Sequence, residues 1–335
     1  MTTFVRTPAR PSIHPHPLNW QPILPKTAQD LSNWGIEPDP NARAVTQENG
    51  TLLYLRTRDQ QEEIFVKIVP RNGVSVESAS FENARLLFAH APITPKPLWQ
   101  KALYNGSAAF AYRLQDGEHP KGQSVNYHNL GLAIRDLHDS LQIVLDEKQI
   151  RAKTTARISA LRAIAAKPSD NEHAAAFTRW QNLANKAQKA FLEYSGPMMK
   201  HGQIIHGDLN PGNIIASENK FVFIDLEDTQ HSFLWPGLDL AKIAERLIVP
   251  EISTSGKLWA KQAWENLNGG YYANQKGALG RVNITISQAL MWHMGLAICL
   301  LKSNDFSQNV IEAELSKFSN ILGMLKEHEA ILNEI

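Results

Sequence analysis

Cysteine and long apolar runs are both scarce in this chain. Its 335 residues include a single cysteine, Cys299, so no internal disulfide can form and nothing indicates a disulfide-stapled secreted scaffold. Cys299 lies in an apolar run, where a small buried side chain is the expected role rather than a nucleophile. The most apolar helical segment, 289–301, is too short to cross a bilayer and carries His293. No signal-peptide pattern is visible, so we expect a cytoplasmic protein without a membrane partner.

Neither sign of charge is in excess. The chain carries 34 Lys and Arg against 33 Asp and Glu, a formal net charge of +1. Because proteins that bind nucleic acid usually show a basic surplus, we expect no nucleic-acid partner. The motif GxxxxGK(S/T) is absent as well, which excludes a P-loop kinase. Length and apolar content are those of an ordinary globular protein with room for two domains.

Strand signals dominate the first part of the chain. Residues 1–40 are rich in proline and predict an extended arm over the first domain. Asn49-Gly50 is a hairpin signal between two strands, and a third strand completes an antiparallel meander. A helix and a second hairpin follow. The predicted strands are 43–47, 51–57, 64–69, 98–104 and 108–114, and the helix is 76–90.

Helical periodicity dominates after residue 115. Pro197 predicts a break between helices. The predicted helices are 127–142, 151–167, 172–194, 238–248, 256–272, 281–302 and 308–332. The sequence therefore predicts an α+β protein with an arm (1–40), a domain made of a sheet and one helix (41–115) and a mostly helical domain (116–335).

The stretch 204–228, IIHGDLNPGNIIASENKFVFIDLED, gathers polar residues at fixed intervals. His206, Asp208 and Asn213 come first, and an apolar strand then ends at Asp225. A strand that stops at an acidic residue places a carboxylate at a sheet edge. Two carboxylates and an amide that converge are suited to a magnesium–phosphate site.

This pattern resembles the small-molecule branch of the protein-kinase-like superfamily, the aminoglycoside phosphotransferases and choline kinases. The matching segments are HGDLNPGN, IDLE and GLDLA, and the resemblance runs from about residue 40 to the C-terminus. It is more specific in the second domain than in the first. The resemblance implies a two-lobe protein-kinase-like fold, ATP as phosphoryl donor and Mg²⁺ as its metal.

The resemblance also implies a role for each polar residue of the motif. Asp208 would accept a hydrogen bond from the attacking hydroxyl and take its proton late, as a general base. Asn213 and Asp225 would hold Mg²⁺ through hard oxygen ligands. His206 and Asp239 would support the loop rather than touch substrate.

In the first domain the resemblance implies a lysine that binds the nucleotide phosphates and a glutamate that forms an ion pair with this lysine. Lys67 lies on the third predicted strand, and Glu82 follows on the helix, in FENARLL. Glu77 competes for the same role, but it lies near the helix start, where an acid commonly interacts with the helix dipole. GxGxxG is absent, so the backbone amides of Gly50 and Thr51 are the expected phosphate contacts.

The acceptor region is defined less sharply. Glu227 and Asp228 directly follow the metal-site strand, and aromatic faces combined with acids suit an ammonium group. A competing interpretation is favoured, because aromatic side chains at helical spacing usually pack between helices in the protein core. The aromatic candidates are Trp259, Trp264 and Trp292.

Taken together, the sequence predicts a kinase that moves the γ-phosphate of ATP to a hydroxyl of a small molecule. An amino alcohol such as choline or ethanolamine, or a sugar or amino sugar, is the expected acceptor. Gly207 replaces the arginine that protein kinases carry after the loop histidine, which disfavours a protein substrate. The alternatives are an aminoglycoside 3'-type phosphotransferase, a kinase of glycated protein side chains and a catalytically inactive nucleotide-binding pseudokinase. The sequence carries no signal for an oligomeric state.

Overall fold

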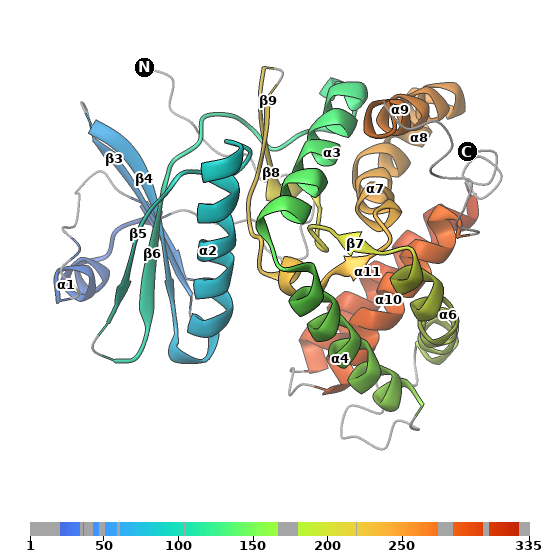
Figure 1. The fold of residues 1–335 in the computed structure, drawn as a ribbon, viewed down its shortest axis with the longest axis horizontal. Helices are drawn as coiled ribbons and strands as arrows, with labels where there is room; N and C mark the ends of the chain where they lie inside the picture. Colours follow the sequence, from blue (N-terminus) through green and yellow to red (C-terminus); the bar gives the residue numbers. More distant parts are fainter. Residues whose placement is uncertain are drawn as a thin grey trace. The chain divides into compact units, whose positions relative to one another are not determined.

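The contacts of the chain divide it into two compact units. Unit 1 comprises Met1–His119 and Gly212–Glu227, and unit 2 comprises Pro120–Pro211 and Asp228–Ile335. The structure, a computed structural model, describes residues 21–33, 36, 43–46, 51–58, 61–103, 105–166, 180–218, 220–273, 284–303 and 308–327. An antiparallel sheet in unit 1 and a mainly helical unit 2 confirm the predicted α+β class (Figure 1).

The larger sheet of unit 1 has six strands in the order β1-β2-β3-β4-β6-β5, and every neighbouring pair is antiparallel. The predicted meander and second hairpin are therefore confirmed, whereas Asn49-Gly50 lies outside the described residues. The strands are β1 (Gln21–Pro22), β2 (Arg43–Thr46), β3 (Leu52–Arg58), β4 (Gln61–Val69), β5 (Pro97–Ala102) and β6 (Ala108–Arg113).

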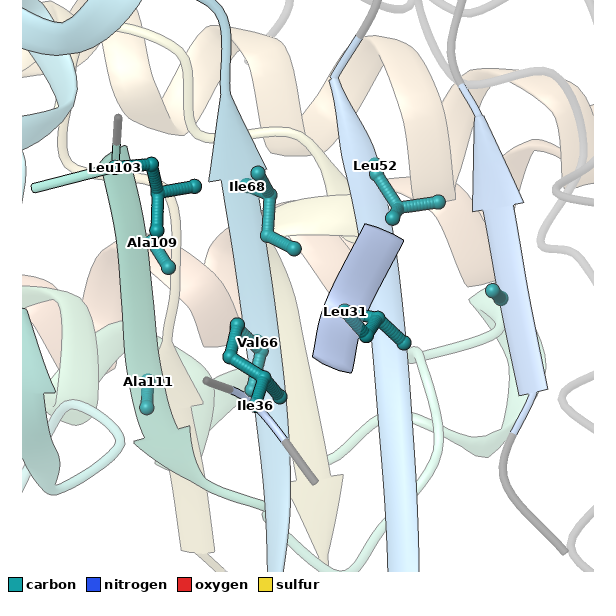
Figure 2. Close-up of a cluster of buried hydrophobic side chains, with 9 residues drawn as sticks. Leu31, Ile36, Leu52, Val66, Ile68, Leu103, Ala109 and Ala111 are labelled. Atoms are coloured by element: carbon teal, nitrogen blue, oxygen red, sulfur yellow. The ribbon is translucent and has the colours of Figure 1, made fainter. Parts of the chain in front are cut away.

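One face of this sheet packs against helix α1 (Pro25–Asn33). Val66 and Ile68 alternate along β4 and are both buried in this layer, as the two-residue period of a strand requires. Figure 2 shows Leu31 of α1 over the strands, and this leucine is fully buried. The prediction of an extended arm is therefore wrong for residues 25–33, because Pro25 occupies the first helical position, which tolerates a missing N–H.

The opposite face of the sheet packs against helix α2 (Val74–His90), which confirms the helix predicted at 76–90. Phe81 of α2 lies with its ring centroid 5.7 Å from that of Phe110 and 5.3 Å from that of Tyr112. Lys67 lies between Val66 and Ile68 on β4, so its side chain points to this α2 face. The alternation of β4 thus places the lysine beside α2.

The hairpin formed by β8 (Ile214–Ser217) and β9 (Lys220–Phe223) belongs to unit 1. We expected it in the second domain with the rest of 116–335. Two backbone connections explain the difference. The Phe223 N–H donates to Ile93 O at 2.8 Å, and Glu118 pairs with Ala216 in an antiparallel bridge. The hairpin therefore adds its polar residues to unit 1.

Unit 2 is built from helices and one short two-stranded sheet, β7 (Gln203–Ile204) with β10 (Phe233–Leu234). Trp292 is fully buried and packs on Phe191, which joins α10 to α6. The helices are α3 (Tyr127–Val144), α4 (Glu147–Ala165), α6 (Gln181–Lys200), α7 (Gly237–Ile243), α8 (Ile252–Ser255), α9 (Lys257–Tyr271), α10 (Ile286–Ser303) and α11 (Gln308–Glu327).

Within the described residues the helix predictions for unit 2 hold apart from shifts at their ends, and the predicted helical positions 167, 172–179, 281–283 and 328–332 lie outside those residues. Pro197 was predicted to break the chain between helices, but it lies in the last turn of α6. That prediction is wrong because a proline so near the C-terminus of a helix disturbs only its final turn. The helix predicted at 238–248 is α7, continued by a π-helical turn at Ala244–Ile248. Within the part of the chain that the structure describes, no helix is both long and apolar enough to cross a bilayer.

Candidate active site

The first cluster of functional side chains lies in unit 1, around Lys67. Its Nζ is 2.5 Å from Glu77 Oε2 on α2 and 3.6 Å from Asp225 Oδ1, which follows strand β9. Tyr112 Oη donates to the other Glu77 oxygen at 3.3 Å. A lysine side chain is thus held between two carboxylates that come from different elements of the same unit.

The charge of Lys67 is secured by these neighbours. Burial alone would lower the pKa of this lysine, but the charges of Asp225 and Glu77 outweigh it and raise the pKa above the ordinary lysine value. Glu227 adds to the same effect. Lys67 is therefore a permanent cation, which is what binding of phosphate oxygens requires.

The prediction that Glu82 holds Lys67 is wrong. The Glu82 side chain is 51% exposed and pairs with Arg85 at 2.6 Å on the outer surface of α2. Five residues along an α-helix correspond to a rotation of roughly 140° from Glu77, so both acids cannot face the sheet. Glu77 shares the inner stripe of α2 with Phe81 and is buried. The helix start, which counted against Glu77, is the part of α2 that passes Lys67.

The β8–β9 hairpin positions Asn213 and Asp225. Its register pairs Ile214 with Phe223, and the Ile224 N–H donates to Asn213 O at 2.9 Å. The hairpin therefore brings the backbone of these two positions close together. Asp225 has a φ of 64°, an arrangement that costs a residue with a Cβ about 1 kcal/mol and that often marks functional sites.

The second cluster lies in unit 2, around Asp208. Lys242 on α7 places its Nζ 2.7 Å from Asp208 Oδ1 and donates to Gly207 O at 3.1 Å. Asn210 Nδ2 donates to the other oxygen, Asp208 Oδ2, at 3.1 Å. The carboxylate predicted as the general base is thus held through both of its oxygens.

Burial and charge act in opposite directions on Asp208. Burial alone would raise the pKa of its carboxyl group, but Lys242 holds that pKa well below the usual range. Burial and the charge of Lys242 lower the pKa of His293. At neutral pH the cluster therefore contains an ionised Asp208 and a neutral His293.

Asp239 braces the loop that carries Asp208. Its carboxylate is fully buried and accepts the N–H groups of His206 at 2.9 Å and Gly207 at 3.1 Å. His138 Nε2 lies 3.0 Å from the same carboxylate, and its Nδ1 lies 2.7 Å from Tyr271 Oη. Asp239 thus binds the backbone of the loop, and His206 is fully buried.

Gly207 occupies a place in this loop that a larger residue cannot take. Its φ is 87°, and a Cβ at this position would collide with Ser232 Oγ. A glycine after the loop histidine is therefore a steric requirement of this chain.

The predicted acceptor residues separate into distinct environments. Asp228 pairs with Arg157 at 3.1 Å. Trp292 is fully buried and donates from Nε1 to Ser195 Oγ at 3.1 Å, so its assignment to substrate binding is wrong and it belongs to the helix core. Trp264 is buried at 8% exposure, whereas Trp259 is half-buried with its ring 6.1 Å from that of Tyr127.

The predicted nucleotide loop is described only in part. Gly50 lies outside the described residues. Thr51 is buried ahead of β3, with a side chain that is only 2% exposed. The proposed phosphate contacts of these two residues therefore stay a prediction.

Sequence reasoning missed Lys242 and His138. Lys242 follows Asp239 by three residues on the same helix, which places both side chains on one face. The sequence did contain one indication of Lys242: a lysine within the apolar segment GLDLAKIA is expected to be buried, and a buried lysine usually has an ion-pair partner. His138 gave no signal, since nothing in the sequence relates α3 to Asp239.

A family model described as a phosphotransferase enzyme family matches residues 42–274. The chain belongs to this family. The resemblance inferred from HGDLNPGN, IDLE and GLDLA is thereby confirmed, and so is the predicted class of enzyme. No curated protein sequence matches the chain.

Solved structures with the same fold include three phosphotransferases. An amicoumacin kinase is 14% identical with a TM-score of 0.58, and the match covers 89% of each chain. An aminoglycoside phosphotransferase from Streptomyces rimosus is 17% identical with a TM-score of 0.52 over 83% of this chain and 99% of its own. A choline/ethanolamine kinase family protein from Mesorhizobium loti is 14% identical with a TM-score of 0.51 over 92% and 98%. These similarities confirm the predicted protein-kinase-like fold.

Proposed function

We propose that this phosphotransferase moves the γ-phosphate of ATP, with Mg²⁺, to a hydroxyl group of a small molecule. The observation that carries the proposal is the position of Lys67, held 2.5 Å from Glu77 and 3.6 Å from Asp225. A fixed cation beside a carboxylate suits a nucleotide whose phosphates need both a lysine and a metal. The amicoumacin kinase of the same fold was solved with AMP-PNP and Ca²⁺, which supports a nucleotide and a divalent cation here.

The residues present fit a metal that is shared with phosphates. In the described ranges of the chain, no group of three or more His, Cys, Asp and Glu could by itself hold a metal ion. Mg²⁺ commonly takes only one or two carboxylates from a protein and completes its shell with phosphate oxygens and water. Asp225 and Asn213 would hold it, and the bound ion would neutralise charge on the phosphate oxygens. Glu227, which acts on the charge of Lys67, would add negative charge on the same side.

Asp208 would act on the acceptor. Its carboxylate is ionised because of Lys242, so it can accept a hydrogen bond from the attacking hydroxyl and orient it. It would take the proton late, as a general base. Asp239 would keep this geometry through the backbone of His206 and Gly207. Most of the catalysis would then consist of positioning and charge neutralisation.

The test is a transfer assay with ATP and Mg²⁺ across choline, ethanolamine, hexoses, amino sugars and aminoglycosides. Asp208→Asn should lower turnover at least a hundredfold on any acceptor found, with little change in nucleotide binding. Glu265→Gln is the control, since it removes a carboxylate from the exposed surface of α9.

A thermal-shift measurement with ATP and Mg²⁺ separates the proposal from an inactive scaffold. Ligands that bind only the folded state raise its melting temperature. Absence of stabilisation at millimolar nucleotide would refute the proposed function. Full activity of Asp208→Asn would refute the role given to this carboxylate.

A further inference from the structure

Lys242 brings a buried positive charge to the residue that would meet the acceptor. Its side chain is only 4% exposed, and its Nζ is 2.7 Å from Asp208 Oδ1 and 3.1 Å from Gly207 O. Lysine is almost never this buried without a specific partner. The base and the lysine therefore form one unit of zero net charge rather than an isolated carboxylate.

The other cations that act on this cluster within the described residues are paired with carboxylates. The pKa of His293 on α10 is influenced by the charges of Asp208, Lys242, Lys317 and Arg246. Arg246 pairs with Glu245 at 2.9 Å, and Lys317 pairs with Glu314 at 3.0 Å. Each of these cations has its carboxylate, and burial keeps His293 neutral. Asp239, the further carboxylate that contacts the Asp208 loop, is fully buried and accepts the N–H groups of His206 and Gly207, so it presents no exposed charge that would replace the hydration of a cationic ligand.

We propose that Lys242 is a specificity-determining residue and that the acceptor carries no positive charge next to its reacting hydroxyl. An uncharged polyol or a hydroxy acid meets this description, whereas an aminoglycoside or choline does not. The inference rests on the proposed function, since it names the acceptor class of that same site.

The position of Lys242 beside Asp208 explains why an uncharged acceptor would be preferred over a cationic one. A hydroxyl that hydrogen-bonds to Asp208 lies about 2.7 Å from a carboxylate oxygen. The groups on the neighbouring carbon atoms then lie within several ångströms of Lys242 Nζ. An ammonium group at that distance meets a like charge and loses its water without gaining an unpaired carboxylate. A hydroxyl, an amide or a carboxylate has no such cost.

The first test compares acceptors that differ only in charge, with the wild-type protein. Choline and 3,3-dimethylbutan-1-ol have the same shape, and glucosamine can be compared with glucose and N-acetylglucosamine. The uncharged member should have at least a tenfold higher kcat/KM, which corresponds to about 1.4 kcal/mol. An equal or higher kcat/KM for the cationic members would overturn the inference and leave the proposed function standing. Transfer to no acceptor of any charge would overturn the proposed function itself, and the inference with it.

The second test assigns the selection to Lys242. Lys242→Gln should shift the ratio of kcat/KM values at least tenfold toward the cationic member, whatever its overall rate. Lys242→Arg keeps the charge and should keep the ratio. Lys261→Gln, which removes an exposed lysine of α9, is the matched control and should also keep it. A lysine with only a structural role would change rate and stability but not this ratio, and an unchanged ratio in Lys242→Gln would overturn the assignment.

Discussion

The partner of Lys67 can be tested with two matched substitutions on α2, Glu77→Gln and Glu82→Gln. Each removes one negative charge and keeps the shape of the side chain. Glu77 is 5% exposed, pairs with Lys67 at 2.5 Å and accepts a hydrogen bond from Tyr112. A buried hydrogen bond to a charged group contributes about 1.5–3 kcal/mol. We therefore expect Glu77→Gln to lower the free energy of unfolding by about 2 kcal/mol.

The same substitution should weaken nucleotide binding. Without the Glu77 charge, Asp225 becomes the nearest carboxylate to Lys67, at 3.6 Å. The lysine would then compete with the metal for Asp225 and would lose the orientation that phosphate binding needs. We expect the KM for ATP to rise at least tenfold, a change of about 1.4 kcal/mol in binding.

Glu82→Gln should leave both quantities unchanged. Its side chain is half exposed and its ion pair with Arg85 lies in solvent, where such pairs contribute little. Urea denaturation measures the first effect, and steady-state kinetics with varied ATP measures the second. A larger rise of the KM for ATP in Glu82→Gln than in Glu77→Gln would refute the assignment of Glu77 as the partner.

Two further predictions concern the loop around Asp208. Gly207→Ala should lower kcat at least tenfold and destabilise the protein by about 1–3 kcal/mol, because it combines a φ of 87° with a collision at Ser232; wild-type kcat in this variant would contradict the close contact. A depressed carboxyl pKa stabilises the fold above the unfolded-state pKa, and this contribution is lost as the pH falls through the folded-state value. Because Lys242 depresses the pKa of Asp208 against its burial, activity should persist below about pH 4, where an ordinary aspartate becomes protonated. Lys242→Gln should move the acid limb of kcat/KM up by about one pH unit or more, and an unmoved limb would show that Lys242 does not control Asp208.

The sheet of unit 1 was predictable because its signals are local. Alternation along β4 and the Asn105-Gly106 turn between β5 and β6 are determined by neighbouring residues. The alternation alone favours a solvent-facing Lys67, and it is the resemblance to kinases that predicts the inward position beside α2. Helix α1 was missed because prolines predict extended backbone, whereas the burial of Leu31 in the core of the sheet depends on tertiary packing.

The segment from His206 to Asp225 was predictable as a candidate site because its spacing is short and the proposed chemistry restricts the residue types. The hairpin after Asn213 fixes the position of Asp225 through backbone pairing, which follows from strand geometry alone. Asp239 could be placed at a helix start, but its three partners in the loop and on α3 could not. Partners such as His138 depend on the packing of distant helices, and sequence periodicity contains no information about that packing.

Glu77 and Lys242 show why counter-ions are harder to predict than the residues they serve. Local rules mislead for both residues: an acid near a helix start is expected to interact with the helix dipole, and a lysine within an apolar helix carries no local sign of its ion-pair partner. In each case the decisive fact is the face of the helix. Glu77 and Phe81 share the inner stripe of α2, and Asp239 and Lys242 share one face of α7. When a helix carries a functional acid or an inward-facing aromatic residue, charged residues three or four positions away on the same face are therefore the first candidates for an ion pair. Distance from the helix start is a weaker criterion for choosing among such candidates.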